Sequence, residues 1–200
     1  MKRNLLLVLV AMVLMGFAAT AGATTHHNDS NSNPGTAELN LGYAKSSEDM
    51  GGGDTMNGGV SFGAAYWMHP SPAFSWGPEV SFDDMGSVEY DNGFTANNEA
   101  SMHLWRIHPS ARYNFSKGVG TQFFGQAGVG LYSVTAKIDD SVLGNASASD
   151  SKMGFNLGAG VNFPVGTNNR MNVTGLWHNV ATEGSSLNYI QIRAGFGFNL

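Results

Sequence analysis

The sequence predicts an all-β protein, an eight-stranded antiparallel up-and-down transmembrane β-barrel. Three observations lead to this prediction. Apolar residues recur at every second position in eight consecutive segments, which is the period of a strand whose two faces meet different surroundings. Charged residues make up only 12% of the chain, about half of their usual share in soluble domains. The polar connections alternate in length, as they do in membrane-spanning barrels.

The N-terminal residues have the layout of a secretory signal peptide. A basic pair precedes an apolar run from Leu5 to Ala19, and small residues follow. This run is shorter than the roughly 20 residues of a transmembrane helix. The chain has no cysteine, which excludes a disulfide framework. We therefore expect a signal peptide over residues 1–23, a disordered periplasmic tail over residues 24–35 and the barrel domain over residues 36–200.

Clusters of Gly, Asn, Asp and Ser separate the eight alternating segments. Each segment is near or above the 9 to 11 residues that a tilted strand needs to cross a bilayer. One face of each segment is apolar or aromatic, and the other face is polar or small. The segments span residues 36–44, 59–68, 73–82, 102–115, 122–136, 153–163, 170–180 and 188–200.

The polar face distinguishes a membrane barrel from a soluble one. A lipocalin-like barrel would show the same alternation, with its apolar face inside and its polar face in water. A water-facing surface should be rich in Lys and Glu, but the eight segments hold only two Glu, four Arg and no Lys. Such a face suits an enclosed lumen, with the apolar face turned to lipid.

The lengths of the connections predict the sidedness of the barrel. Outer-membrane barrels have short periplasmic turns and longer outer loops, so both ends of the barrel domain are expected on the periplasmic side. The outer loops hold twelve of the fifteen acidic residues, including the pairs Asp83–Asp84 and Asp139–Asp140, which we interpret as solvated loop charge. The short turns cover residues 69–72, 116–121 and 164–169, and the outer loops cover residues 45–58, 83–101, 137–152 and 181–187.

Two prolines lie inside predicted strands. Pro78 and Pro109 cannot donate a ladder hydrogen bond, so we expect bulges or local breaks at these positions.

The interior of an eight-stranded barrel is just wide enough for side chains to fill. The charged residues on the polar faces should therefore meet and pair, because an unpaired buried charge costs several kcal/mol. Arg193 should point inward to Glu38 or Glu79. A structural filling of the lumen and a gated polar path both remain open. The predicted lumen charge network consists of Glu38, Glu79, Arg106, Arg112 and Arg193.

The sequence predicts no catalytic residue, metal site or cofactor. His178 is the histidine closest to a reactive arrangement, with Glu183 and Ser185 following it near the outer rim, but residue types without geometry favour a polar rim residue. His103 and His108 are an odd number of residues apart on one predicted strand, so their side chains face opposite sides and cannot share a metal. The acidic exterior argues against nucleic-acid binding.

The last segment keeps its alternation up to the C-terminal residue, although chain ends are usually polar and frayed. A closed barrel needs its final strand paired with its first, since no edge is tolerated in lipid. We expect this strand to close the barrel and to guide insertion, with Ile190, Ile192, Phe196, Phe198 and Leu200 facing lipid.

The stretches "FFGQAGVGLY", "FNLGAGVNF" and "LWHNV" and the closing "SSLNYIQIRAGFGFNL" resemble the small outer-membrane β-barrel family of OmpA/OmpX-like and opacity-type surface proteins. The resemblance covers residues 36–200. It implies an eight-stranded barrel in the cell outer membrane, embedded in outer-membrane lipid and delivered by periplasmic chaperones to the barrel-assembly machinery. Family members usually end in an aromatic residue, whereas Asn199 and Leu200 follow Phe198 here.

The loops vary in composition while the barrel supplies only rigidity, which favours a non-catalytic structural or surface-interaction role through the acidic outer loops, with an unknown extracellular ligand. One alternative is a small-solute channel similar to the OmpW type. Another is a lipid A-modifying enzyme, but the His-x-Ser motif of lipid A deacylases is not met at His178, because Val180 stands two residues on.

Overall fold

The computed structural model describes residues 35–47, 56–90, 98–116, 120–140, 144–166, 168–182 and 185–200. The predicted signal peptide and the predicted tail up to residue 34 lie outside this part. Within the described residues no helix is long and apolar enough to cross a membrane.

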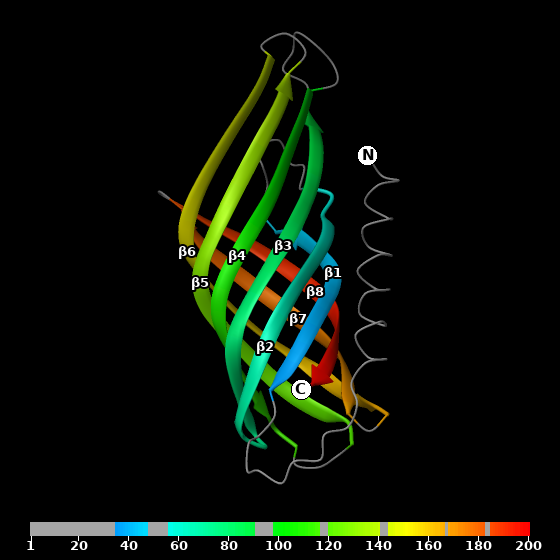
Figure 1. The fold of residues 1–200 in the computed structure, drawn as a ribbon. Helices are drawn as coiled ribbons and strands as arrows, with labels where there is room; N and C mark the ends of the chain where they lie inside the picture. Colours follow the sequence, from blue (N-terminus) through cyan, green and yellow to red (C-terminus); the bar gives the residue numbers. More distant parts are fainter. Residues whose placement is uncertain are drawn as a thin grey trace. The chain divides into compact units, whose positions relative to one another are not determined.

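Eight antiparallel strands form a closed barrel in which each strand pairs with its neighbours in the sequence and β8 pairs with β1 (Figure 1). The predicted fold class is confirmed. The strands are β1 (Thr36–Ser46), β2 (Gly59–Ser71), β3 (Phe74–Tyr90), β4 (Asn98–Asn114), β5 (Gln122–Asp140), β6 (Gly144–Val165), β7 (Asn169–Thr182) and β8 (Ser185–Asn199).

The alternation in the sequence corresponds to the two faces of the barrel wall. On β4, Trp105 and Ile107 are 50% and 60% exposed on the outer surface, whereas Arg106 between them is 2% exposed in the lumen. An outer surface of large apolar side chains around a polar interior is the inverse of a soluble protein. It is the arrangement of a barrel that has lipid as its solvent.

Strand β8 closes the barrel against β1 along an unbroken register that runs from Thr36↔Asn199 to Ser46↔Tyr189. We call the end of the barrel that holds Thr36 and Asn199 the terminal end, and the opposite end the distal end. At the terminal end, the Leu200 amide also donates a hydrogen bond of 2.9 Å to the Gly35 carbonyl. The last strand is therefore held along its whole length.

Four strands continue past the distal end of the barrel. The β2–β3 pairing starts at Ser61↔Asp83 and the β6–β7 pairing at Gly154↔Val180. Beyond these pairs, β3, β4, β5 and β6 continue as a four-stranded extension, which we call the distal sheet (Figure 1). It consists of residues 87–90, 98–101, 133–140 and 144–152.

The distal sheet corrects the prediction that residues 83–101 and 137–152 are loops. Most of these residues are strand, and only residues 91–97 and 141–143 lie outside the described part. In β6, residues 144–151 are all exposed, so both faces of the sheet meet water there. A strand with two wet faces has no apolar alternation, which is why its sequence is typical of a loop.

The prolines do not bulge the strands that contain them. Pro78 and Pro109 pair directly with each other, and β3 and β4 continue through them. The register shifts lie elsewhere, between Met68 and Ser71 and between Asp84 and Ser87. The prediction of bulges at the prolines was therefore wrong. Local breaks in pairing do occur beside them, because the β4–β5 register passes from Ile107↔Leu131 to Ser110↔Gly128 without intervening pairs, and the β2–β3 register likewise skips Pro78.

Candidate functional site

The lumen is filled by side chains in successive layers. In the layer nearest the terminal end, Arg112 donates two hydrogen bonds to Glu38, of 2.6 Å and 2.8 Å, and a third of 2.8 Å to Gln126. Its guanidinium lies 3.9 Å from the centre of the Trp67 ring and 4.8 Å from that of Phe124. Arg112 is therefore paired in the plane of its guanidinium and covered by aromatic faces.

Glu79 is the centre of the next layer. Arg193 binds it in bidentate fashion, with Nη1 donating to Oε1 and Nη2 donating to Oε2 over 3.0 Å. Gln126 donates to Oε2 over 3.2 Å, and Arg106 Nη2 lies 3.4 Å from Oε1. His108 Nε2 lies 3.6 Å from the same oxygen. Of the two partners left open for Arg193 by the sequence, Glu79 is the one that it contacts.

Asp83 is the third buried carboxylate, and it corrects the prediction that this residue is solvated loop charge. Its carboxylate lies 3.0 Å from Arg106 Nη1 and accepts hydrogen bonds from Ser61, Tyr189 and Gln191 at 2.6 Å, 3.0 Å and 2.8 Å. Strand β3 continues its alternation further than predicted, and the parity of Asp83 directs its side chain inward.

His178 lies inside the lumen rather than at an outer rim. Its ring stacks on Tyr189 with centroids 4.2 Å apart and planes 3° from parallel, and its Nε2 lies 2.9 Å from Arg106 Nη1. Glu183 and the side chain of Ser185, which follow it in the sequence, lie outside the described part. The ring is fully buried, so the interpretation of His178 as a rim residue was wrong.

An apolar cluster closes the distal end of the lumen above these layers. It combines three methionines with small, branched and aromatic side chains from several strands and the segment before β2. Met is unbranched and flexible, which suits it to filling irregular gaps. The cluster consists of Ala44, Met56, Met85, Met102, Leu104, Tyr132, Val180, Leu187 and Tyr189.

The buried charges of the described lumen balance. Three arginines, Arg106, Arg112 and Arg193, face three carboxylates, Glu38, Glu79 and Asp83, and each of the six is at most 5% exposed. An uncompensated charge in such an interior would be strongly destabilising. The five residues predicted from the sequence contain three arginines but only two carboxylates. That imbalance was the signal for a missing partner.

His108 and Ser110 form a contact that the sequence analysis missed. Together with Pro109 they have His-x-Ser spacing, both face the lumen, and Ser110 Oγ lies 2.9 Å from His108 Nδ1. A side chain in place of Gly128 would place its Cβ 2.5 Å from Ser110 Oγ, so this glycine makes room for the pair. Ser110 is 3% exposed, and Glu79 behind His108 is bound by Arg193. A nucleophile needs access to its substrate, which this enclosed pair lacks.

The residues of the predicted insertion strand lie on the outer surface of β8 and just beyond its end. Ile190, Ile192 and Leu200 are 51%, 59% and 71% exposed. Phe196 and Phe198 are half-buried on the same face and contact each other, with ring centroids 4.8 Å apart. All five share the outer face of the barrel wall, whereas their contact with lipid and their part in insertion stay predictions.

The remaining polar candidates do not assemble. Within the described residues there is no group of three His, Cys, Asp or Glu side chains that could hold a metal ion. His103 and His108 are on opposite faces of β4, with His103 beside Phe82 on the outer surface.

Comparison with known proteins places the chain in a family. The model of the family described as outer membrane protein beta-barrel domain matches residues 9–199, so the chain belongs to this family. It is an outer-membrane β-barrel protein, embedded in the lipid of that membrane. A search of curated protein sequences gives no significant match.

Solved structures with the same fold include several bacterial outer-membrane proteins. Neisserial surface protein A aligns with a TM-score of 0.61 at 14% identity, over 83% of this chain and 97% of that protein. A major outer membrane protein from Thermus thermophilus aligns with a TM-score of 0.57 at 11% identity, over 83% and 99%. Ail of Yersinia pestis, in complex with the heparin analogue sucrose octasulfate, aligns with a TM-score of 0.51 at 19% identity, over 82% and 99%. At these identities the likeness concerns the fold alone.

Proposed function

We propose that this protein is a non-catalytic surface-interaction protein of the outer membrane. In this proposal the barrel is a rigid support with a closed lumen, and the distal sheet is the part that meets a partner. The observation that carries the proposal is the distal sheet itself, an ordered extension of four strands with an open edge.

The topology supports an extracellular position of the distal sheet. In outer-membrane barrels the short turns face the periplasm, and the two-residue turn at residues 72–73 lies at the terminal end. The distal end then faces the outside. The ten residues of β6 from Gly144 to Met153 would reach about 30 Å beyond the last β6–β7 pair, at roughly 3.3 Å per residue.

Strand β6 offers an edge to a partner strand. Residues 144–153 pair with β5, and no described strand covers their other side. Ala and Ser make up five of the six residues from Ala146 to Ser151, so the side chains along this part of the edge are small. An exposed edge of this length is a template for strand addition.

The charge of the distal sheet indicates which partners it would favour. Glu89 lies directly opposite Glu99, and Glu99 directly opposite Asp139, so three carboxylates cross three neighbouring strands. This row favours a basic or neutral partner over a polyanion. The heparin analogue bound to Ail is a polyanion by its name, so a similar ligand is not what this surface favours.

A shortened hairpin tests the proposal. Replacing residues 137–147 by Asn-Gly would join Ala136 to Ala148, which are already directly opposite, through a two-residue turn. We expect the variant to reach the outer membrane and to keep its heat-dependent gel migration, while cells that display it lose the attachment to protein-coated surfaces conferred by the full chain. Equal attachment by both forms, or none by the full chain, would contradict the proposal.

We also propose an export route that matches the predictions from the sequence. It consists of removal of residues 1–23, passage with periplasmic chaperones, and insertion by the barrel-assembly machinery, which would read the β8 residues Ile190, Ile192, Phe196, Phe198 and Leu200. The continuous pairing of β8 with β1 supports a strand that must be placed correctly for the barrel to close.

A further inference from the structure

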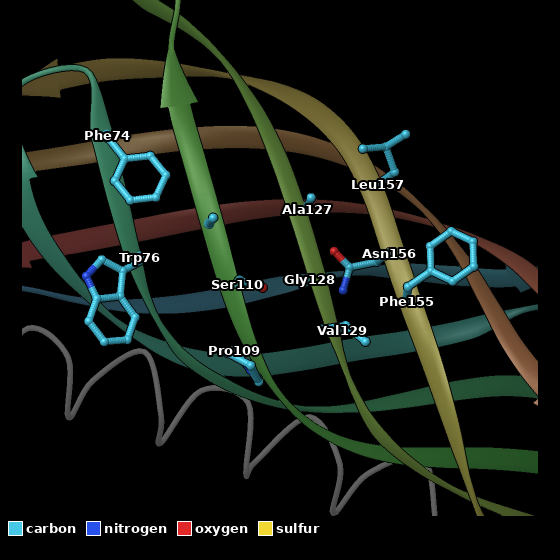
Figure 2. A pocket seen from close by; sticks show the side chains of 11 residues that line it. Phe74, Trp76, Pro109, Ser110, Ala127, Gly128, Val129, Phe155, Asn156 and Leu157 are labelled. Atoms are coloured by element: carbon cyan, nitrogen blue, oxygen red, sulfur yellow. The ribbon is translucent and has the colours of Figure 1, made fainter.

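A groove crosses the outer surface of the barrel over β4 and β5. Its volume is about 660 Å³. Phe74 and Trp76 of β3 form one wall, and Phe155 and Leu157 of β6 form the other, with small side chains between them (Figure 2). All four wall residues are more than a third exposed.

The groove arises from the side chains that share one row of the wall. Trp76 lies opposite Ala111, Ala111 opposite Ala127, and Ala127 opposite Leu157. Two alanines side by side between a tryptophan and a leucine leave a depression on an otherwise bulky surface. Pro109 lies on the same floor, where the β4–β5 pairing skips two residues.

The lining of the groove is apolar. Its two polar residues, Ser110 and Asn156, belong to the lumen face and are 3% and 1% exposed. Among the described residues, no Lys, Arg, Asp or Glu lines the groove. The neighbouring row toward the terminal end, Phe74–Tyr113–Gly125–Ala159, is uncharged as well. Such a lining accepts hydrocarbon and offers nothing to a phosphate group.

We propose that this groove binds one acyl chain of a glycerophospholipid, in the leaflet at the terminal end. Phe74 is the first residue of β3, and the four residue-to-residue steps from it to Pro78 cover about 14 Å along the strand. Half of a hydrocarbon core of about 30 Å has a similar depth. The groove runs along the tilted strands between its walls, so a chain that lies in it crosses this leaflet at the tilt of the strands. Lipid A is disfavoured because the described lining holds no basic side chain, and a second barrel is disfavoured because its convex wall does not enter a concave groove.

Native mass spectrometry of the full barrel tests this proposal. The protein is reconstituted with phosphatidylethanolamine and lipid A together and then released from mild detergent. We expect one phospholipid to stay bound to the wild type. Ala127→Phe fills the floor of the groove and should abolish this adduct. Ala194→Phe makes the same change on the exposed outer face of β8 and should keep it. Heat-dependent gel migration checks that both variants are folded.

Each other outcome overturns the proposal. Retention of phospholipid by folded Ala127→Phe would place the lipid elsewhere, and equal loss in both variants would make the adduct non-specific. Retention of lipid A in place of the phospholipid would show that the groove binds lipid A. A dimer of the barrel that is lost only in Ala127→Phe would show that the groove binds a second copy of the chain. If the wild type retains no lipid, the groove does not bind an acyl chain.

Discussion

Arg106 and Asp83 form an ion pair of 3.0 Å inside the barrel, with both side chains fully buried. Asp83 brings the number of buried carboxylates in the described lumen to that of the buried arginines, and it links β3 to β4, β2 and β8 through its contacts.

Neutralising Asp83 should destabilise the barrel strongly. In Asp83→Asn, Arg106 keeps only Glu79 as a buried anionic partner among the described residues, and Glu79 is shared with Arg193. Breaking a buried pair on one side costs about 3–5 kcal/mol. Urea unfolding in lipid vesicles should show this loss, whereas Asp139→Asn on the exposed distal sheet should change the free energy of unfolding little. Equal stability of the two variants would refute the role of Asp83.

Arg193 should be sensitive to both charge and shape. Arg193→Glu sets a carboxylate against Glu79 and should reduce assembled barrel most. Arg193→Lys keeps the charge but loses the bidentate geometry, so it should give an intermediate yield. Lys137→Glu, a charge reversal in the distal sheet, is the control. Gel quantification of the folded, heat-shifted form measures the yields, and a yield of Arg193→Glu equal to the control would count against the predicted pairing.

Removing the central charge of the carboxylate row should stabilise the distal sheet. Like charges directly opposite on neighbouring strands cost about 0.2–1 kcal/mol, and Glu99 has one on each side. In Glu99→Gln, amide exchange in residues 133–140 should slow roughly two- to thirtyfold, because the substitution removes two such repulsions. At about 1 M salt the gain should shrink, because exposed charges are screened. An unchanged exchange rate at low salt would show that the row carries no repulsion.

The Ser110–His108 pair should be chemically silent. Because Ser110 is enclosed by the barrel wall and Glu79 is occupied by arginine, a fluorophosphonate probe should not label the folded protein in vesicles. Labelling that disappears in Ser110→Ala would show an accessible nucleophile and would reopen the enzymatic alternative.

The sequence predicted the parts of the fold that depend on a contrast between two faces. Lipid on one side and packed polar side chains on the other produce strict alternation, as in Trp105, Arg106 and Ile107. Residues 144–151 of β6 are exposed on both faces, so they carry no such contrast, and their sequence is typical of a loop. The alternation of apolar residues on β3 weakens after residue 82, so the sequence predicts that the strand ends there. This early end places Asp83 in a loop, although β3 continues to Tyr90.

The contents of the lumen were predictable as residue types but not as contacts. The alternation along each strand predicts that Glu79 and Arg193 point into the lumen. Whether Arg193 contacts Glu79 or Glu38 depends on the relative heights of these residues in the barrel, which no local sequence pattern encodes. Met56 lies in a predicted connection, and nothing in its neighbourhood indicates that its side chain is buried over the lumen. Met85 continues the inward parity of Asp83 on β3. The contact between His108 and Ser110 could have been predicted from the sequence, because residues two apart on a strand lie on the same face.

The conductance of the purified barrel in planar lipid bilayers tests the closed lumen most directly. We expect the wild type to show no defined current steps, and Arg106→Gln combined with Arg193→Gln to stay silent if it assembles. Reproducible steps in the wild type, with a conductance or ion selectivity that this double substitution alters, would show that ions pass the arginine layers and that the lumen is open.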